Sequence, residues 1–459
     1  MSGFWTMRRV SLALGGGPRE DRELRAVCTD TRTVGEGDLF VALKGERFDG
    51  HDFLREAIAR GAGAVVVHDA TRAAGLGVPA YVVPSTLFAI GILARYRRRA
   101  WGRPVVAVAG SNGKTSTKEL IRAALGARLE VHATQGNFNN QVGVPLTLLA
   151  LPDHADIAVV EVGTNTPGEI VLLRTIVDPD IAVVTTVQEE HLEGFGDIEG
   201  VMREEASLLD GVGTAVVPAA ETALVAEATR RARRTVTAGL VSGGLAAMPY
   251  GLADDGTGWL TVDGVRITVP LRGMHNLRNA MLALAVAREC GVSLVEAGAA
   301  IGAMDTSTML SMRSSVAPLG EALLINDAYN SNPGSARAAF ALLSTVGANR
   351  QRVVVLGTMR ELGAQSERAH REIARAALES GASVVAGIGE FAAALQAVAP
   401  GDERVVTARD VEDLWPLLQA RLSETAAILL KASRGVRLER LLPQLTAWAV
   451  ADVSPYRET

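Results

Sequence analysis

The sequence predicts an α/β protein in three domains, and three observations support this prediction. Short apolar runs, typical of strands buried on both faces of a parallel sheet, recur along the chain. Helical patterns separate most of these runs, which implies right-handed strand–helix–strand units. The length of 459 residues exceeds one ordinary domain. We expect a small α/β domain over 1–101, a central parallel-sheet domain with a phosphate-binding loop over 102–312, and a C-terminal Rossmann-like α/β domain over 313–459.

The first block alternates short strands and helices. Apolar runs predict its strands and helical apolar spacing predicts its helices, and Ser85 suits the cap at the start of the last helix. Trp101–Pro104 then breaks the pattern, so we place the first boundary there. The expected elements are strands over Asp38–Leu43 and Ala64–Val67 and helices over His51–Ala62 and Thr86–Ala100.

The central and last blocks repeat the rhythm of a doubly wound sheet. Trp259–Pro270 instead alternates around Asp263-Gly264, which predicts an antiparallel hairpin at the edge of the central domain. His275–Glu289 predicts a strong helix. The expected strands are Val105–Ala109, Ile157–Val162 and Ile181–Thr186 in the central block, and Leu323–Asp327, Arg352–Leu356, Ser383–Ala386 and Ala427–Lys431 in the last block.

Composition limits the class of protein. Hydrophobic residues make up 48% and charged residues 21%, as in ordinary globular proteins, and the net charge of −5 gives no reason to expect nucleic acid as a partner. Two cysteines, Cys28 and Cys290, cannot form a disulfide framework. No segment reaches the length of a membrane span, and Val10–Leu14 is too short for a signal-peptide core. We expect a cytoplasmic monomer with no integral membrane segment.

The run Gly110-Ser-Asn-Gly-Lys-Thr115 carries the strongest chemical signal. It follows the strand Val105–Ala109 and leads into a helical pattern over Ser116–Leu125, which is the context that a phosphate-binding loop needs. Glycines let backbone N–H groups approach anionic oxygens, and the helix N-terminus adds positive partial charge. Lys114 can reach the outer phosphates and the hydroxyl of Thr115 can ligate magnesium. We expect a nucleotide to contact Gly110, Ser111, Asn112, Gly113, Lys114, Thr115 and Ser116.

Two further residues lie near strand ends, where ligands of open α/β sheets bind. Glu161 follows one apolar run, and a carboxylate beside the loop threonine is a natural magnesium ligand. His191 lies shortly after another run, and an imidazole can complete a second metal site. A solvated carboxylate and an ordinary structural histidine are the alternatives.

Two asparagine-rich stretches and one basic stretch complete the set of candidates. Amides can orient ligands with paired donors and acceptors, although asparagine clusters also form simple turns. Lys431–Arg434 ends the last long strand and places two cations there, with a solvated turn as the alternative. The asparagine-rich stretches are Thr134–Asn140 and Asp327–Pro333.

Taken together, these motifs resemble the Mur ligases of peptidoglycan synthesis, over nearly the whole chain. The loop Gly110–Thr115 is shared by all members and by folate-type ligases. The strings Gly136-Asn-Phe-Asn-Asn140 and Asp327-Ala-Tyr-Asn-Ser-Asn-Pro333 are similar to those of the member that uses D-alanyl-D-alanine. The other matching stretches are Asp30–Arg32, Gly37–Leu43, Asp49–Phe53, Gly143–Thr147, His191–Gly196, His275-Asn276, Glu361–Gly363 and Lys431–Arg434.

The resemblance implies an ATP-dependent, ADP-forming ligase that adds D-alanyl-D-alanine to UDP-N-acetylmuramoyl-tripeptide through an acyl phosphate. Catalysis would then be mainly positioning and charge neutralisation. Lys114 would hold the β- and γ-phosphates, Thr115 and Glu161 one Mg²⁺, and His191 would help to hold a second. Asn276 would read adenine, and Arg313 and Asp327 would also contact ATP. The implied substrate-binding residues are Thr31, Arg32, Asn137, Asn139, Asn140, Tyr329, Asn330, Asn332, Lys431, Ser433 and Arg434.

Some positions depart from the family pattern. A lysine that CO₂ converts to a carbamate usually stands fourteen residues after the metal histidine, and Glu205 stands there in this chain. We interpret Glu205 as a permanent carboxylate that replaces the carbamate; Glu204, or no role for either, is the alternative. Thr186, Thr358 and Ala432 replace the usual Asn, Asp and Gly, and none of these changes removes a phosphate or primary metal ligand.

Two other functions stay open at this stage. A sister Mur ligase would add a different amino acid, and an assay with different acceptors would distinguish it from a ligase that adds D-alanyl-D-alanine. A non-catalytic paralogue would bind nucleotide and act as a scaffold among cell-wall enzymes. Lys114, Thr115, Glu161 and His191 are all present, which favours an enzyme.

Overall fold

The apolar runs of the central block form a seven-stranded sheet in the computed structural model, which describes residues 3–18, 20–45, 48–306 and 314–451. Its strand order is β13-β12-β11-β10-β7-β9-β8. The pairs β7–β9, β8–β9, β11–β12 and β12–β13 are parallel, as the buried apolar runs predict. The strands are β7 (Val105–Ala109), β8 (Val131–Ala133), β9 (Ile157–Glu161), β10 (Ile181–Val184), β11 (Thr214–Pro218), β12 (Arg234–Gly239) and β13 (Leu245–Ala246).

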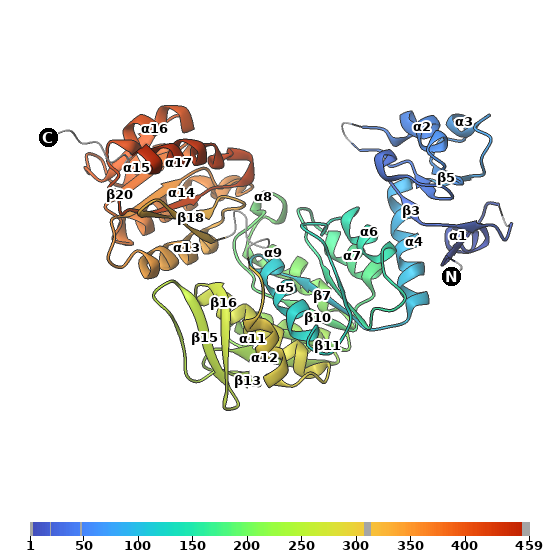
Figure 1. The fold of residues 1–459 in the computed structure, drawn as a ribbon, viewed down its shortest axis with the longest axis horizontal. Helices are drawn as coiled ribbons and strands as arrows, with labels where there is room; N and C mark the ends of the chain where they lie inside the picture. The colour runs from blue at the N-terminus through green and yellow to red at the C-terminus, as the bar shows by residue number, and fades with distance from the viewer. Residues whose placement is uncertain (1–2, 19, 46–47, 307–313, 452–459) are drawn as a thin grey trace. The chain divides into compact units, whose positions relative to one another are not determined.

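The hairpin expected around Asp263-Gly264 is present, but it belongs to a separate sheet. Both turn residues have positive φ, of 46° and 80°, as a two-residue hairpin turn requires. The sheet packs against the last two helices of the central block, and Figure 1 shows β15 and β16 beside α11. Its strands are β14 (Tyr250–Leu252), β15 (Thr257–Val262) and β16 (Val265–Arg272). The central helices are α5 (Lys114–Leu125), α6 (Gly143–Leu149), α7 (Glu169–Val177), α8 (Leu192–Phe195), α9 (Ile198–Ala206), α10 (Thr222–Arg231), α11 (Met274–Glu289) and α12 (Leu294–Gly302).

The first block contains a four-stranded parallel sheet and the long helix α4 (Thr86–Trp101), which lies beside β5 and α1 (Figure 1). Ser85 caps α4 as predicted, because its hydroxyl accepts a hydrogen bond from the backbone nitrogen of Phe88. The helix expected over 51–62 is shorter than predicted, because Asp49 caps a 3₁₀ turn that precedes it. The elements are β1 (Trp5–Thr6), α1 (Met7–Leu14), β2 (Glu23–Leu24), β3 (Val27–Cys28), β4 (Leu39–Val41), α2 (Leu54–Ala59), β5 (Ala64–Val67), α3 (Ala70–Ala73) and β6 (Ala80–Val82).

The last block forms the second α/β unit that the apolar rhythm predicts. Its sheet has the order β17-β18-β22-β19-β20-β21, parallel except for the edge strand β17. The strands are β17 (Ser315–Leu319), β18 (Ala322–Asp327), β19 (Arg352–Leu356), β20 (Val384–Ile388), β21 (Val405–Ala408) and β22 (Ala427–Lys431). The helices are α13 (Pro333–Val346), α14 (Ser366–Glu379), α15 (Glu390–Val398), α16 (Val411–Gln419) and α17 (Leu442–Ala451).

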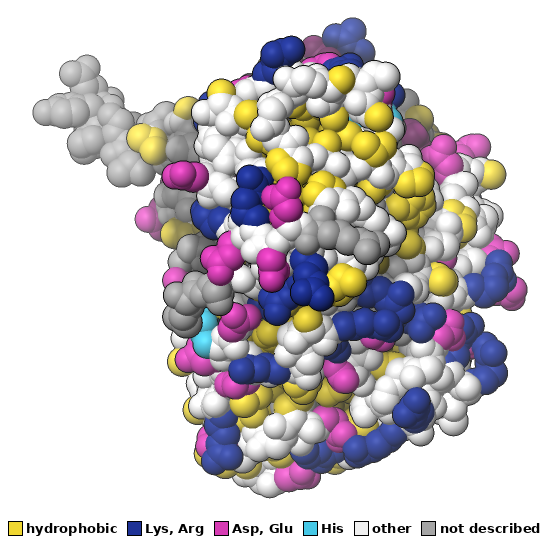
Figure 2. Space-filling model, turned by 90° about the vertical axis from the view of Figure 1, so that its right-hand side faces the viewer, with side chains coloured by type: hydrophobic (Ala, Val, Ile, Leu, Met, Phe, Trp, Pro, Cys, Tyr) yellow, Lys and Arg dark blue, Asp and Glu magenta, His cyan; other side chains and the backbone are white. Residues whose placement is uncertain are grey.

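By its internal contacts the chain divides into two compact units. The first contains Met1–Val108, Leu129–Thr164 and Gly168–Ala182, and the second contains Ala109–Arg128, Asn165–Pro167 and Val183–Thr459. The domain boundaries expected after residues 101 and 312 stay predictions, and the second lies outside the described residues. Among the helices that the structure describes, none combines the length and the apolar character needed to cross a membrane. Figure 2 shows basic and acidic side chains interspersed over one face of the molecule.

Candidate active site

The loop after β7 has a backbone that only glycine suits at two positions. Gly110 and Gly113 have φ angles of 122° and 82°, in the region that favours glycine. A Cβ at Gly110 would lie 2.8 Å from the backbone nitrogen of Thr185, and one at Gly113 would lie 2.8 Å from Oδ1 of Asn279. α5 begins at the next residue, Lys114. The loop therefore presents bare backbone at a helix N-terminus, which is the cradle that a phosphate group requires.

The ammonium group of Lys114 lies against its own loop. Its Nζ donates hydrogen bonds to the carbonyl oxygens of Gly110 at 2.5 Å and of Ser111 at 3.4 Å. It also lies 3.8 Å from Oε1 of Glu190. Lys114, which the sequence predicts to bind the phosphates, is thus held at the loop by backbone oxygens and by a carboxylate.

Two buried carboxylates flank this lysine. Glu190 is 4% exposed and Glu205, on α9, is 1% exposed. Oε2 of Glu205 accepts a hydrogen bond from the backbone nitrogen of Gly110 at 2.8 Å. Burial raises the pKa of Glu205 to about 7 and raises the pKa of Glu190 above its ordinary value, while the charge of Lys114 opposes both shifts. Perturbed carboxylates of this kind gather at functional sites.

His191 lies at the same cluster and pairs with a residue of the last block. Its Nδ1 forms an ion pair with Oε2 of Glu361. Burial lowers the pKa of His191, but the hydrogen bond to Glu361 and the charge of Glu190 outweigh burial, so the pKa is raised. The backbone also joins these segments, since the nitrogen of Glu193 donates to the oxygen of Glu361 at 3.0 Å. The imidazole therefore lies between two acidic side chains.

Glu161 is the last residue of β9 and lies opposite Val108, near the end of β7. Its side chain is buried, and its Oε1 accepts a hydrogen bond from Nδ2 of Asn139 at 2.9 Å. Its backbone nitrogen donates to Oγ1 of Thr134 at 2.9 Å. The carboxylate thus lies at the carboxyl edge of the sheet, as predicted, and an asparagine of the Gly136–Asn140 string contacts it.

Asn112 in the loop and Asn332 in the last block exchange a pair of side-chain hydrogen bonds. Each Nδ2 donates to the other's Oδ1 at 3.1 Å. Asn112 also donates to Oε1 of Gln188 at 2.7 Å. Asn332 in turn caps α13 through the backbone nitrogen of Ser335. A residue expected to bind substrate is therefore placed at the phosphate-binding loop.

The residues expected near adenine form a second group. Nδ2 of Asn276 donates to the carbonyl oxygen of Arg272 at 2.8 Å. Burial lowers the pKa of the neighbouring His275, and the charge of Asp327 partly offsets this effect. Asp327 pairs with Lys431 at 2.9 Å, and Lys431 is 1% exposed. The charge of Asp327 thus acts on His275, in the first turn of α11, and Asp327 also pairs with the buried Lys431.

The remaining predicted residues lie on turns. Arg32, in the 3₁₀ turn Thr31–Thr33, pairs with Asp30 and is exposed. The carbonyl oxygen of Asn137 accepts a bond from the backbone nitrogen of Asn139 at 2.8 Å. Oδ1 of Asn140 accepts bonds from the backbone nitrogens of Val142 and Gly143 at 3.1 and 2.9 Å. These contacts show which turns carry the predicted residues.

Four further predicted residues come from the stretches that contain Asp327 and Lys431, and the first of them contacts Lys431. The carbonyl oxygen of Asn330 accepts a hydrogen bond from its ammonium group. Oγ of Ser433 accepts a bond from the backbone nitrogen of Arg360 at 2.9 Å. The guanidinium of Arg434 lies 5.9 Å from the ring centre of Tyr329. Arg313, expected to contact ATP, lies outside the described residues.

The residues present suit a nucleotide and a divalent cation. The bare loop backbone at Gly110 and Gly113 fits phosphate oxygens, and Thr115 and Ser116 lie in the first turn of α5. The hydroxyl of Thr115, the carboxylate of Glu161 and the imidazole of His191 are donor types that Mg²⁺ accepts. Among the described residues, no three His, Cys, Asp or Glu side chains already converge as metal ligands. The donor set therefore fits the group by chemistry.

Sequence reasoning missed two members of the cluster, Glu190 and Glu361. Glu190 stands next to Glu189, which is partly exposed and pairs with Arg368. Two adjacent glutamates give no sign of which one faces inward. Glu361 lies in a string that resembles the family, but its φ of 65° and its contact with His191 depend on the tertiary fold. Proximity to a motif histidine was the only available signal.

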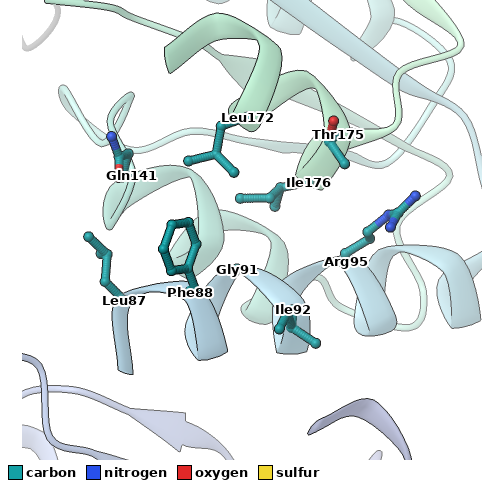
Figure 3. A pocket seen from close by; sticks show the side chains of 9 residues that line it. All are labelled: Leu87, Phe88, Gly91, Ile92, Arg95, Gln141, Leu172, Thr175 and Ile176. Carbon is teal, nitrogen blue, oxygen red and sulfur yellow. The ribbon is translucent and has the colours of Figure 1, made fainter. Parts of the chain in front are cut away.

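The first unit also contains an apolar cavity of about 240 Å³ between α4 and α7. Figure 3 shows Phe88 of α4 pointing toward Leu172 and Ile176 of α7. Carbon atoms form nearly all of its wall, and no carboxylate or imidazole lines it. Arg95 is the one charged side chain that lines it, and no carboxylate or imidazole is there to hold magnesium, so the candidate active site is the charged cluster at the loop.

The chain matches three family models. The Mur ligase middle domain matches residues 108–287, the Mur ligase glutamate ligase domain matches residues 312–434, and the Mur ligase family catalytic domain matches residues 23–98. These matches cover more than half of the chain. The chain belongs to the Mur ligase family, as its motifs predict.

Individual relatives narrow the comparison. The UDP-N-acetylmuramoyl-tripeptide–D-alanyl-D-alanine ligase of Bacillus subtilis is 33% identical over 93% of this chain and 94% of its own. The ligase of the same name from Escherichia coli is 34% identical, with the same coverage. The crystal structure of MurF from Acinetobacter baumannii has a TM-score of 0.88 at 29% identity and covers 96% of this chain and 99% of its own. MurF from Thermotoga maritima, solved in complex with ADP, has a TM-score of 0.82 at 27% identity over 94% and 99% of the two chains.

Proposed function

We propose that this chain is an ATP-dependent, ADP-forming ligase that adds D-alanyl-D-alanine to UDP-N-acetylmuramoyl-tripeptide. The names of relatives that match nearly end to end support the pair of substrates. One observation carries the chemistry: a glycine loop at a helix N-terminus holds Lys114 beside two buried carboxylates. The product is a precursor of peptidoglycan, so the activity serves cell-wall biogenesis, cell shape and cell division. We place the enzyme in the cytoplasm as a monomer.

The proposed roles follow the chemistry of each group. The peptide carboxylate is itself a nucleophile, and its attack on the γ-phosphoryl group gives an acyl phosphate, which the amine of D-alanyl-D-alanine then opens. Lys114 holds the β- and γ-phosphates, and the loop backbone orients them. Thr115 and Glu161 would hold one Mg²⁺ and His191 would help to hold a second, and these ions would supply charge neutralisation when bound. Asn276 reads adenine, and Asn139 positions Glu161.

We propose that Glu205 replaces the carbamylated lysine of the family. Three features support this role: Glu205 is buried, its Oε2 bonds to the loop nitrogen of Gly110, and its negative charge interacts with Lys114. A glutamate carries its carboxylate permanently, whereas a lysine gains one only after reaction with CO₂. The alternative residue, Glu204, is also buried, and its carbonyl oxygen accepts a bond from the hydroxyl of Ser207.

The test of the proposed function is release of inorganic phosphate from ATP with synthetic UDP-N-acetylmuramoyl-tripeptide, with and without D-alanyl-D-alanine. We expect continuous release only when both substrates and Mg²⁺ are present, and no release with excess EDTA. Diaminopimelate or lysine in place of the dipeptide tests for a sister ligase. ATP binding without turnover on any of these acceptors would favour the scaffold alternative.

A further inference from the structure

Glu190 lies on a segment that is fastened directly to the phosphate-binding loop. The backbone nitrogen of Ser111 donates to the carbonyl oxygen of Thr186 at 2.8 Å. The hydroxyl of Ser111 accepts from the backbone nitrogen of Gln188 at 2.9 Å and donates to its carbonyl oxygen at 3.2 Å. Oγ1 of Thr185 donates to the carbonyl oxygen of Asn112 at 2.5 Å. These bonds fix the backbone on which Glu190 stands relative to the loop.

The side chain of Glu190 is buried against this loop and faces the cation of Lys114 at 3.8 Å. Lys114 at the same time bonds to the carbonyl oxygens of Gly110 and Ser111, so its ammonium group is turned back onto the loop. The second buried carboxylate, Glu205, also acts on Lys114. The positive charge of Lys114 is therefore engaged by oxygen atoms of the protein.

A polyphosphate that enters the cradle must draw Lys114 away from these oxygens. The carboxylate of Glu190 is then left buried, close to the negative oxygens of the ligand and without its nearest cation. A like charge in a buried site is strongly unfavourable. A divalent cation that arrives with the nucleotide reverses the balance, because it attracts both the phosphates and the carboxylate.

We propose that Glu190 makes this site selective for the cation-loaded nucleotide, by holding Lys114 back from a polyphosphate that carries no divalent cation. Glu190 is a positioning residue that acts through Lys114, and the inference rests on the proposed nucleotide site. It goes beyond that site because it assigns the rejection of metal-free nucleotide to one residue.

The test measures ADP binding by isothermal titration calorimetry, once with excess EDTA and once with excess MgCl₂. The quantity of interest is the ratio of the two dissociation constants. In EDTA, Glu190→Gln should bind ADP about tenfold more tightly than the natural chain, which corresponds to about 1.4 kcal/mol. With Mg²⁺ the two should differ much less, so the variant loses most of the cation dependence. Glu190→Asp keeps the charge and should keep the natural ratio.

Glu189→Gln is the matched control, because Glu189 is the adjacent glutamate and pairs with Arg368 at the surface. It should keep the natural ratio. Should Glu190→Gln fail to fold, as judged by its melting temperature, Glu190→Ala must show the same loss of cation dependence. An unchanged ratio in a folded Glu190 variant would overturn the proposal, as would an equal loss in Glu189→Gln. If the natural chain binds no ADP in either condition, the proposed function itself is wrong.

Discussion

Two histidines of the second unit, the buried His370 and the partly buried His191, show how differently the protein treats the same side chain. His370, on α14, bonds to backbone through both nitrogens: Nε2 accepts from the nitrogen of Met359 at 2.9 Å, and Nδ1 donates to the oxygen of Ser366 at 2.8 Å. Burial lowers its pKa, so it stays neutral. His191 instead faces the carboxylates of Glu361 and Glu190, which raise its pKa against the effect of burial.

The two histidines represent two kinds of polar group: those that stabilise the fold and those that are placed to bind a ligand. At His370 both ring nitrogens bond to main-chain atoms, and the carboxylate of Glu390 lies 3.2 Å from Nδ1. At the loop, Lys114, Glu190, His191 and Glu205 are charged groups that face one another across several ångströms. Such an arrangement costs folding free energy and is typical of functional sites. Changes at the loop should therefore affect activity, and changes at His370 should affect stability.

The largest expected effect follows from removal of the loop cation. Lys114→Ala should lower the rate of phosphate release about 10³-fold, because no other group neutralises the phosphoryl charge in the same position. The melting temperature is measured alongside, as a check that the variant folds. Arg122→Ala on the same helix removes an exposed cation that pairs with Glu119 and should leave the rate unchanged. A comparable rate loss in both variants would show that α5 as a whole, rather than Lys114, had been disturbed.

A smaller effect concerns the permanent carboxylate at position 205. Phosphate release by the natural chain should not change when bicarbonate is added to enzyme freed of CO₂, because Glu205 needs no carbamylation. Glu205→Gln should lower the rate about 10²-fold, by loss of one charge from the site. Glu205→Lys restores the usual residue of the family, and its residual activity should rise with bicarbonate. Clear rescue of the natural chain by bicarbonate would contradict the role given to Glu205.

Most of the fold could be predicted from the sequence, because buried parallel strands are nearly continuous apolar runs. Val105–Ala109 and Ala427–Lys431 are strands at the predicted bounds. The helix predicted over 51–62 is shorter in the structure, since apolar spacing does not reveal that Asp49 caps a 3₁₀ turn before it. The separate sheet of β14–β16 contains the hairpin predicted around Asp263-Gly264, but alternation alone does not tell which sheet a hairpin joins.

The candidate site could be predicted only where a motif carried it. Gly110–Thr115 follows a strand directly and Glu161 ends one, so the local pattern predicted their place at the sheet edge. Glu190 and Glu361 were missed, because their contacts join segments that are distant in sequence and that only the tertiary fold brings together. Lys431 was expected to bind substrate, and that role stays a prediction; its burial against Asp327 could not be read from the motif.

The smallest expected effect is a pH dependence of stability that distinguishes His370 from His191. The pKa of His370 is lowered in the folded chain. As the pH falls from about 7.5 to 5.5, the unfolded chain therefore binds a proton at this histidine more readily than the folded chain does. Its contribution to stability is present above its ordinary pKa of 6.5 and is lost as the pH falls through the folded value. Glu390, whose Oε2 lies 3.2 Å from Nδ1, is the acidic group that moderates this loss.

His370→Gln cannot titrate, so the free energy of unfolding of the natural chain, measured relative to this variant in urea, should fall by about 1 kcal/mol over that range. His132 and His275, whose pKa values burial also lowers, are present in both chains and cancel in the difference. ADP binding with Mg²⁺ should be the same in both, because His370 serves only the packing of α14. A difference that stays constant with pH would mean that the pKa of His370 is the same in the folded and unfolded chains, and the two histidines would then no longer mark two kinds of site.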